Sequence, residues 1–175
     1  MQIFISSYCY ILVMNVNNSN NLSHSSNDDD KSFQQFDLDG IDFNIVLSGN
    51  KTGGKYSLLE LHFSTEKENE VPLHLHSRET LVIYILEGNF SFKYGNEKID
   101  GNQGTLLKFE KDIPHSYRKT GKTPGRLLIL FFPAGFENFF LDLGLNQSKM
   151  KQSREEDQVL LHVLEKKYGG KFVFG

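Results

Sequence analysis

Short apolar runs separated by turn residues extend from residue 41 to residue 133. The runs are rich in Ile, Val, Leu, Phe and Tyr, and the clearest lie at 56–63, 81–87, 90–94, 105–109 and 126–132. Turn sequences such as Glu87-Gly88-Asn89 separate them. Several short strands at intervals of about 8–12 residues are typical of an all-β sandwich or barrel. The pattern therefore predicts one antiparallel β-domain at residues 36–133.

The pattern becomes helical after residue 133. Residues 136–143 predict a short Phe-rich helix. A second helix should begin at Ser153, because Glu156 three residues later would complete a capping box. Its apolar residues recur at helical spacing and two glycines end it. We expect residues 134–175 to form a helical extension packed on the barrel.

The first 35 residues contain little that could fill a core. Residues 15–30 are almost entirely Asn, Ser and Asp, which predicts a disordered tail over residues 1–35. The apolar stretch within residues 1–14 is too short to span a bilayer. No Lys or Arg precedes Lys31, which disfavours a secretory signal. A weak signal peptide and a start at Met14 stay open as alternatives.

Composition narrows the class of protein. The chain has 175 residues, enough for one domain, and a formal net charge of −3. Without clustered basic residues, neither nucleic acid nor a membrane is an expected partner. Cys9 is the only cysteine, so no internal disulfide can form, and the cytoplasm is the simplest location.

Two of the six histidines form a pair that could bind a metal ion. His74 and His76 stand at positions i and i+2, just before a strong strand, so their side chains should share one face. Two imidazoles on one face can bind the same ion, although such pairs also arise by chance. His62 fits a partly buried strand position, His162 fits a surface or packing position on the last helix, and His24 lies in the tail.

The sequence around this pair resembles the cupin superfamily. Residues 72–88, PLHLHSRETLVIYILEG, resemble the first cupin motif, and residues 104–118, GTLLKFEKDIPHSYR, resemble the second and supply His115. The resemblance covers about residues 43–132 and is closest to single-domain quercetin dioxygenase-like proteins. It implies a small antiparallel β-barrel, the double-stranded β-helix or jelly roll, with C-terminal α-helices. The three histidines would converge inside the mouth of this barrel.

One departure from the motif leaves the ligand set open. Metal-binding cupins usually carry an acidic ligand where this chain has Leu81. Glu79, two residues earlier, would face the same side of an extended chain. His74, His76 and His115 could hold the metal alone, or Glu79 could complete the site. In the third interpretation the metal site is degenerate, and the barrel only binds a ligand or a partner.

The resemblance implies a small-molecule metalloenzyme of the dioxygenase class. Its cofactor would be a divalent ion such as Fe, Mn, Ni, Co or Zn, holding substrate and O₂ and acting as a Lewis acid. A largely apolar barrel would suit a small organic molecule. The alternative is a non-catalytic cupin that serves as a ligand-binding or structural module. No catalytic residue is assigned, and a homodimer is the expected assembly.

Two packing expectations accompany these hypotheses. If Leu81 faces inward, Ile83 and Ile85 do so too, and Tyr84 faces the other way. Five Phe residues lie within residues 131–140. They are expected to pack between barrel and helix, with an apolar lid or a dimer surface as the alternative.

Overall fold

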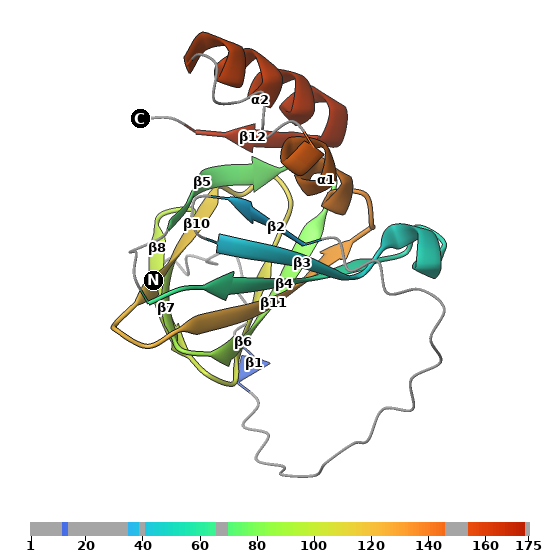
Figure 1. Ribbon diagram of the computed structural model, residues 1–175. Coiled ribbons are helices and arrows are strands. Elements are labelled where there is room, and N and C mark those ends of the chain that lie inside the picture. The colour runs from blue at the N-terminus through green and yellow to red at the C-terminus, as the bar shows by residue number, and fades with distance from the viewer. Residues whose placement is uncertain (1–11, 14–34, 39–40, 66–69, 146–153, 174–175) are drawn as a thin grey trace, which may run out of the picture.

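The computed structural model describes residues 12–13, 35–38, 41–65, 70–145 and 154–173 (Figure 1). A seven-stranded antiparallel sheet has the order β1-β9-β6-β11-β4-β3-β2. Its strands are β1 (Leu12–Val13), β2 (Gln35–Leu38), β3 (Ile41–Leu47), β4 (Ser57–Phe63), β6 (Thr80–Glu87), β9 (Thr105–Phe109) and β11 (Gly125–Phe132).

A five-stranded sheet has the order β12-β5-β10-β7-β8. Its strands are β5 (Glu70–His76), β7 (Asn89–Tyr94), β8 (Glu97–Asn102), β10 (His115–Thr120) and β12 (Gly170–Phe172). The 3₁₀ helix η1 (Gly49–Thr52) lies between β3 and β4, and the α-helices are α1 (Glu137–Leu145) and α2 (Arg154–Tyr168). The predicted all-β jelly-roll barrel with C-terminal helices is confirmed.

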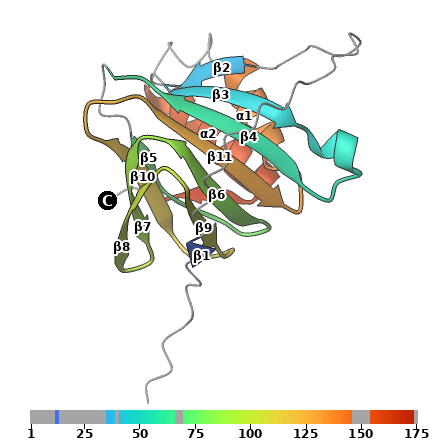
Figure 2. The same ribbon diagram turned by 90° about the horizontal axis from the view of Figure 1, so that it is seen from below.

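The core lies between the two sheets, which face each other in Figure 2. Alternate residues of each strand point to the same side of a sheet. Leu81, Ile83 and Ile85 of β6 are accordingly buried, as predicted, whereas Tyr84 is only partly buried. Burying each such aliphatic side chain contributes about 1.5–3 kcal/mol to stability.

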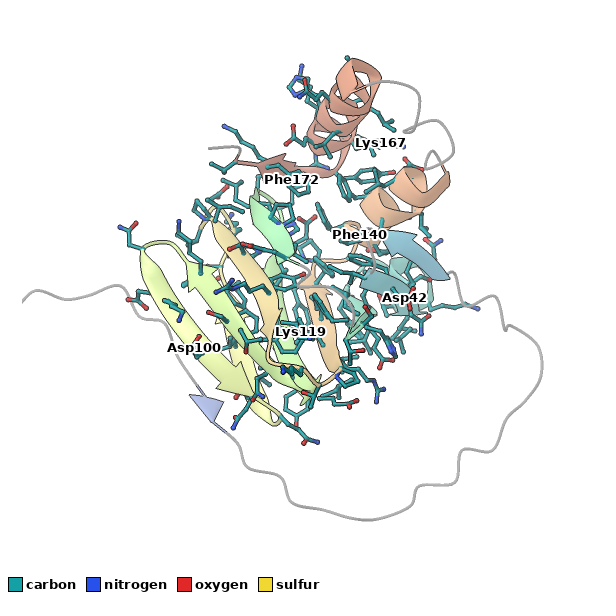
Figure 3. All side chains as sticks on the ribbon, turned by 60° about the vertical axis from the view of Figure 1, so that its left-hand side comes forward. Asp42, Asp100, Lys119, Phe140, Lys167 and Phe172 are labelled. Carbon is teal, nitrogen blue, oxygen red and sulfur yellow. The ribbon has the colours of Figure 1, made fainter. Side chains whose placement is uncertain are left out.

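The C-terminal extension packs on one end of the barrel. Phe140 of α1 packs on Phe43 of β3 with ring centroids 4.8 Å apart, and Figure 3 shows Phe140 beside the strands. Helix α1 is also tied to η1, because the buried Glu137 carboxylate accepts hydrogen bonds from Gly49 N at 2.8 Å and Gly135 N at 2.6 Å. The extension is therefore continuous with the core.

Strand β12 was not predicted. The second helix ends at Tyr168, next to the glycines expected to end it, and Gly169 adopts a left-handed φ of 76°. The chain then pairs antiparallel with β5, placing Gly170 opposite His76 and Phe172 opposite His74. A Cβ on Gly170 would come within 2.9 Å of the Phe136 ring, so glycine permits this approach. Ser153 lies outside the described residues, so its capping box stays a prediction.

Only three positions of the predicted tail are described. Leu12 and Val13 form β1, which pairs with Leu106 and Thr105 of β9, and Gln35 begins β2. The rest of residues 1–35 lies outside the described part of the chain. None of the helices described is long and apolar enough to cross a membrane.

Candidate metal centre

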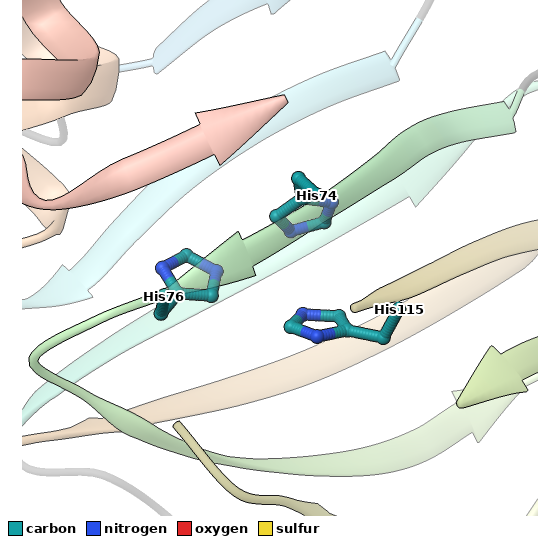
Figure 4. A group of neighbouring side chains, drawn as sticks. All are labelled: His74, His76 and His115. Atoms are coloured by element: carbon teal, nitrogen blue, oxygen red, sulfur yellow. The ribbon is translucent and has the colours of Figure 1, made fainter. Parts of the chain in front are cut away.

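Three histidines meet from two neighbouring strands of the five-stranded sheet (Figure 4). His74 and His76 end β5, and His115 begins β10, where it pairs with His74. One potential ligand atom from each ring lies within 4.8 Å of those from the other two. The three residues are 5%, 1% and 0% exposed, respectively. The fold therefore brings together the three histidines that the family resemblance implied as a group.

Backbone carbonyls fix two of these rings. His74 Nδ1 lies 2.7 Å from the Pro72 carbonyl oxygen, and His115 Nδ1 lies 2.9 Å from that of Ile113. A carbonyl can only accept, so each Nδ1 carries the proton and donates it. The lone pair of each Nε2 is then free to bind a metal ion. No sequence pattern marked these two carbonyls in advance.

Burial keeps all three imidazoles neutral. Desolvation, followed by the nearby His115, lowers the pKa of His74 to about 3. Desolvation lowers the pKa of His115 to about 4. Desolvation, followed by the other two rings, holds the pKa of His76 well below its ordinary value. Neutral imidazole is the form that binds metal, so no proton has to leave at neutral pH.

Several polar atoms in the cluster have no hydrogen-bond partner. They are Nε2 of His115 and both ring nitrogens of His76, all of them buried. A buried polar atom without a partner is costly and needs a reason. A divalent ion supplies one, because imidazole nitrogens are good ligands for Zn, Cu, Fe and Ni. The three histidines are thus positioned to bind a metal ion.

Glu79 lies beside the cluster but is not part of it. Its carboxylate oxygen Oε2 lies 3.8 Å from His76 Nδ1, and the residue is 3% exposed. The close group of possible ligand atoms consists of the three histidines alone among the described residues. Burial raises the pKa of the Glu79 carboxyl to about 7. Its role as a fourth ligand stays a prediction. Leu81 is a 1% exposed core residue and offers no ligand atom.

Aromatic rings surround the histidines. The ring centroid of Phe136 lies 4.0 Å from that of His76, and the centroid of Phe172 lies 5.6 Å from that of His74. Phe109 packs against His115 at 5.1 Å. Phe172 of β12, labelled in Figure 3, was missed because its strand was missed. Within the Phe-rich run the predicted core packing is confirmed for most rings, whereas Phe132 is 39% exposed.

The remaining described histidines lie apart from this cluster. His62 lies 3.2 Å from Glu60, and its side chain is 44% exposed. His162 lies 3.4 Å from Glu165 on the outside of α2, and its side chain is 64% exposed. Neither belongs to the group of converging histidines, as the sequence indicated.

Comparisons with known proteins agree with this fold. Residues 62–131 match the family model for a cupin domain. A cupin resembling RmlC from Shewanella frigidimarina is 19% identical, with 67% of this chain and 96% of that chain covered and a TM-score of 0.52. KdgF from a Halomonas species is 18% identical, with coverages of 60% and 90% and a TM-score of 0.52.

A predicted oxalate decarboxylase from Thermotoga maritima is 21% identical, with 53% of this chain and 80% of that chain covered and a TM-score of 0.50. At these identities the likeness concerns the fold alone. No curated protein matches the chain.

Proposed function

The chain carries a domain of the cupin superfamily, and from this premise we propose that it binds a divalent metal ion and acts on a small, largely apolar organic molecule. The ligands are His74, His76 and His115. The reaction class we propose is a dioxygenase-like oxidation. The observation that carries the proposal is the convergence of three neutral, buried imidazoles, of which His76 and His115 have unpartnered nitrogens.

The described residues fit such an ion by their chemistry. When bound, an ion such as Fe(II) held by three imidazoles keeps coordination positions open for O₂ and substrate and acts as a Lewis acid. The Pro72 and Ile113 carbonyls hold two rings in the tautomer that presents Nε2. The surrounding rings of Phe109, Phe136 and Phe172 exclude water and favour an apolar substrate.

A second candidate function rests on the same packing. Leu81 stands where an acidic ligand is usual, and the Phe136 ring packs directly on His76. These features also suit a non-catalytic cupin whose barrel serves as a ligand-binding or structural module. The two functions differ in one measurable property, which is tight binding of metal.

We base the expected location, partner and assembly of the protein on its composition and its sheet edges. A single cysteine suits the cytoplasm. The partner is a small molecule rather than nucleic acid, since the formal net charge is −3. We expect a homodimer, because association would cover exposed sheet edges.

Metal content tests the proposal. The full chain is compared by elemental analysis with a His74→Ala/His76→Ala variant. The matched control is His62→Ala/His162→Ala, which removes two histidines outside the cluster. One equivalent of metal in the wild type and the control, absent from the site variant, supports the metal site. A wild-type chain that binds no metal after incubation with Fe(II) or Mn(II) refutes it and favours the non-catalytic cupin.

Oxygen consumption tests the reaction class. The metal-loaded chain is screened with small aromatic and enolic compounds in an oxygen electrode. Substrate-dependent uptake of O₂ that the site variant lacks supports the dioxygenase. A metal-loaded chain that consumes no O₂ with any of these compounds contradicts the dioxygenase and leaves the metal site standing.

A further inference from the structure

We propose that Glu79 is a positioning residue that accepts a hydrogen bond from His76 Nδ1 and thereby directs His76 Nε2 toward the bound metal. The inference rests on the proposed metal site and deepens it. It assigns Glu79 a place beside the ligands rather than among them. The alternative, in which Glu79 is the fourth ligand, becomes an outcome of the test.

The three histidine rings differ in whether a hydrogen bond at Nδ1 fixes their orientation. His74 and His115 each donate from Nδ1 to the backbone carbonyl two residues earlier, at 2.7 and 2.9 Å. Both nitrogens of His76 lack a hydrogen-bond partner, although the ring is 1% exposed. Figure 4 shows one edge of this ring turned toward the other two histidines. His76 is therefore the only ring of the cluster whose Nδ1 has no orienting partner.

The nearest candidate for that partner is the Glu79 carboxylate. Its oxygen Oε2 is itself buried without a partner and lies 3.8 Å from His76 Nδ1. A hydrogen bond between these atoms needs a separation of about 2.7–3.2 Å. Rotation of the Glu79 carboxylate group can move Oε2 far enough to reach this separation. Glu79 directly precedes β6, three residues after His76, and so lies in the turn that joins their strands.

Counting the unpartnered atoms favours a positioning role. One metal ion on Nε2 of His76 and His115, with one hydrogen bond from His76 Nδ1 to Glu79 Oε2, would satisfy all four unpartnered atoms. If Glu79 instead bound the ion, His76 Nδ1 would stay buried without a partner, at a cost of about 1–3 kcal/mol. Carboxylates that accept from the second nitrogen of a ligating histidine commonly raise metal affinity about 10–100-fold.

The other buried carboxylate among the described residues, Glu137, is already engaged and does not accept a hydrogen bond from His76 Nδ1. Glu137 accepts from Gly49 N and Gly135 N, which ties α1 to η1. Arg78, the neighbour of Glu79, donates instead to the Lys167 carbonyl at the end of α2. Of the two buried carboxylates among the described residues, Glu79 is therefore the one placed to accept from His76 Nδ1.

Cobalt binding tests the inference without measuring turnover. Co(II) affinity is measured by chelator competition, and the visible spectrum of bound Co(II) reports the ligand set. In Glu79→Gln the amide oxygen can still accept from His76 Nδ1. We expect an unchanged spectrum and an affinity close to that of the wild type. In Glu79→Ala we expect an affinity about 10–100-fold weaker and the same number of ligands.

Glu110→Gln is the matched control, because it makes the same chemical change in an exposed carboxylate paired with Lys108. A spectrum altered by Glu79→Gln would show that Glu79 is a ligand and refute the inference. Equal affinities in Glu79→Ala and the wild type would also refute it. A wild-type chain that binds no Co(II) refutes the proposed function itself. If Glu79→Ala does not fold, Glu79→Gln still tests the inference. A Co(II) affinity of Glu79→Gln well below that of the wild type would overturn the positioning role.

Discussion

Acid should destabilise the metal-free protein, because the fold buries imidazoles in their neutral form. A histidine in the unfolded chain binds a proton near pH 6.5. In the folded chain, burial lowers the pKa of His74 to about 3 and that of His115 to about 4. Between these pH values the unfolded state binds more protons than the native state. The free energy of unfolding therefore falls as the pH falls.

The size of this fall in the free energy of unfolding follows from the width of the pH window. Each pH unit between the folded and unfolded pKa values of one histidine changes the free energy of unfolding by about 1.4 kcal/mol. From about pH 6.5 to about pH 4.5, His74 and His115 together should remove about 5 kcal/mol of stability, and His76 changes it in the same direction. Most domains have only about 5–15 kcal/mol in total.

Glu79 opposes this trend. Burial raises the pKa of its carboxyl from 4.5 to about 7, so across most of this window the native state binds its proton first. Its contribution to stability therefore grows as the pH falls toward 4.5, by about 3 kcal/mol. Across this window the net loss of stability should then be about 2 kcal/mol in the wild type but about 5 kcal/mol in Glu79→Gln, where the histidine contribution is unopposed.

Urea unfolding followed by circular dichroism measures these differences. Metal-free wild type, Glu79→Gln and Glu79→Gln/His115→Gln are compared between about pH 7 and about pH 4.5. Replacing His115 should roughly halve the loss caused by the two histidines. A free energy of unfolding that stays constant with pH in Glu79→Gln would refute the burial of neutral imidazoles.

Two further predictions concern packing and access. Gly125→Ala should lower stability by about 1–3 kcal/mol in urea unfolding, since its Cβ would lie 2.6 Å from the buried Phe90 ring; wild-type stability would contradict the tight contact. Leu75→Cys/Lys171→Cys, made in a Cys9→Ser background, joins β5 to β12 at directly paired positions. The oxidised form should take up Co(II) several-fold more slowly than the reduced form, and equal rates would show that metal enters without displacement of β12.

Local sequence pattern accounts for the strands of the barrel and for the shared face of His74 and His76. Alternation along 81–85 predicted which side chains of β6 are buried, because a strand has a side-chain period of two. The i and i+2 spacing of His74 and His76 placed both rings on one face. Only the family resemblance joined His115 to them, since register between distant strands depends on the whole sheet.

The parts that escaped prediction depend on contacts between distant segments. Strand β12 has three residues and carries little local signal. Its place is set by pairing with β5 and by contact between Phe172 and the His74 ring. The sequence placed Glu79 near the histidines as a candidate ligand, but the 3.8 Å separation of its carboxylate from His76 Nδ1 depends on how the turn between β5 and β6 closes. Such features follow from tertiary packing, which a short sequence window does not contain.

The closure of the site sets a condition on any substrate. A molecule that approaches His74 from the side of β12 must displace Phe172, whose burial is worth at most about 1.5–3 kcal/mol. Detaching β12 also breaks strand hydrogen bonds worth about 1 kcal/mol each. An opening cost of about 4 kcal/mol would leave about one molecule in a thousand open and weaken apparent affinity by the same factor. A ligand that replaces the Phe172 ring with its own apolar surface recovers part of this cost. Under the proposed function, a closed site of this kind would favour an apolar substrate over a polar one of the same size.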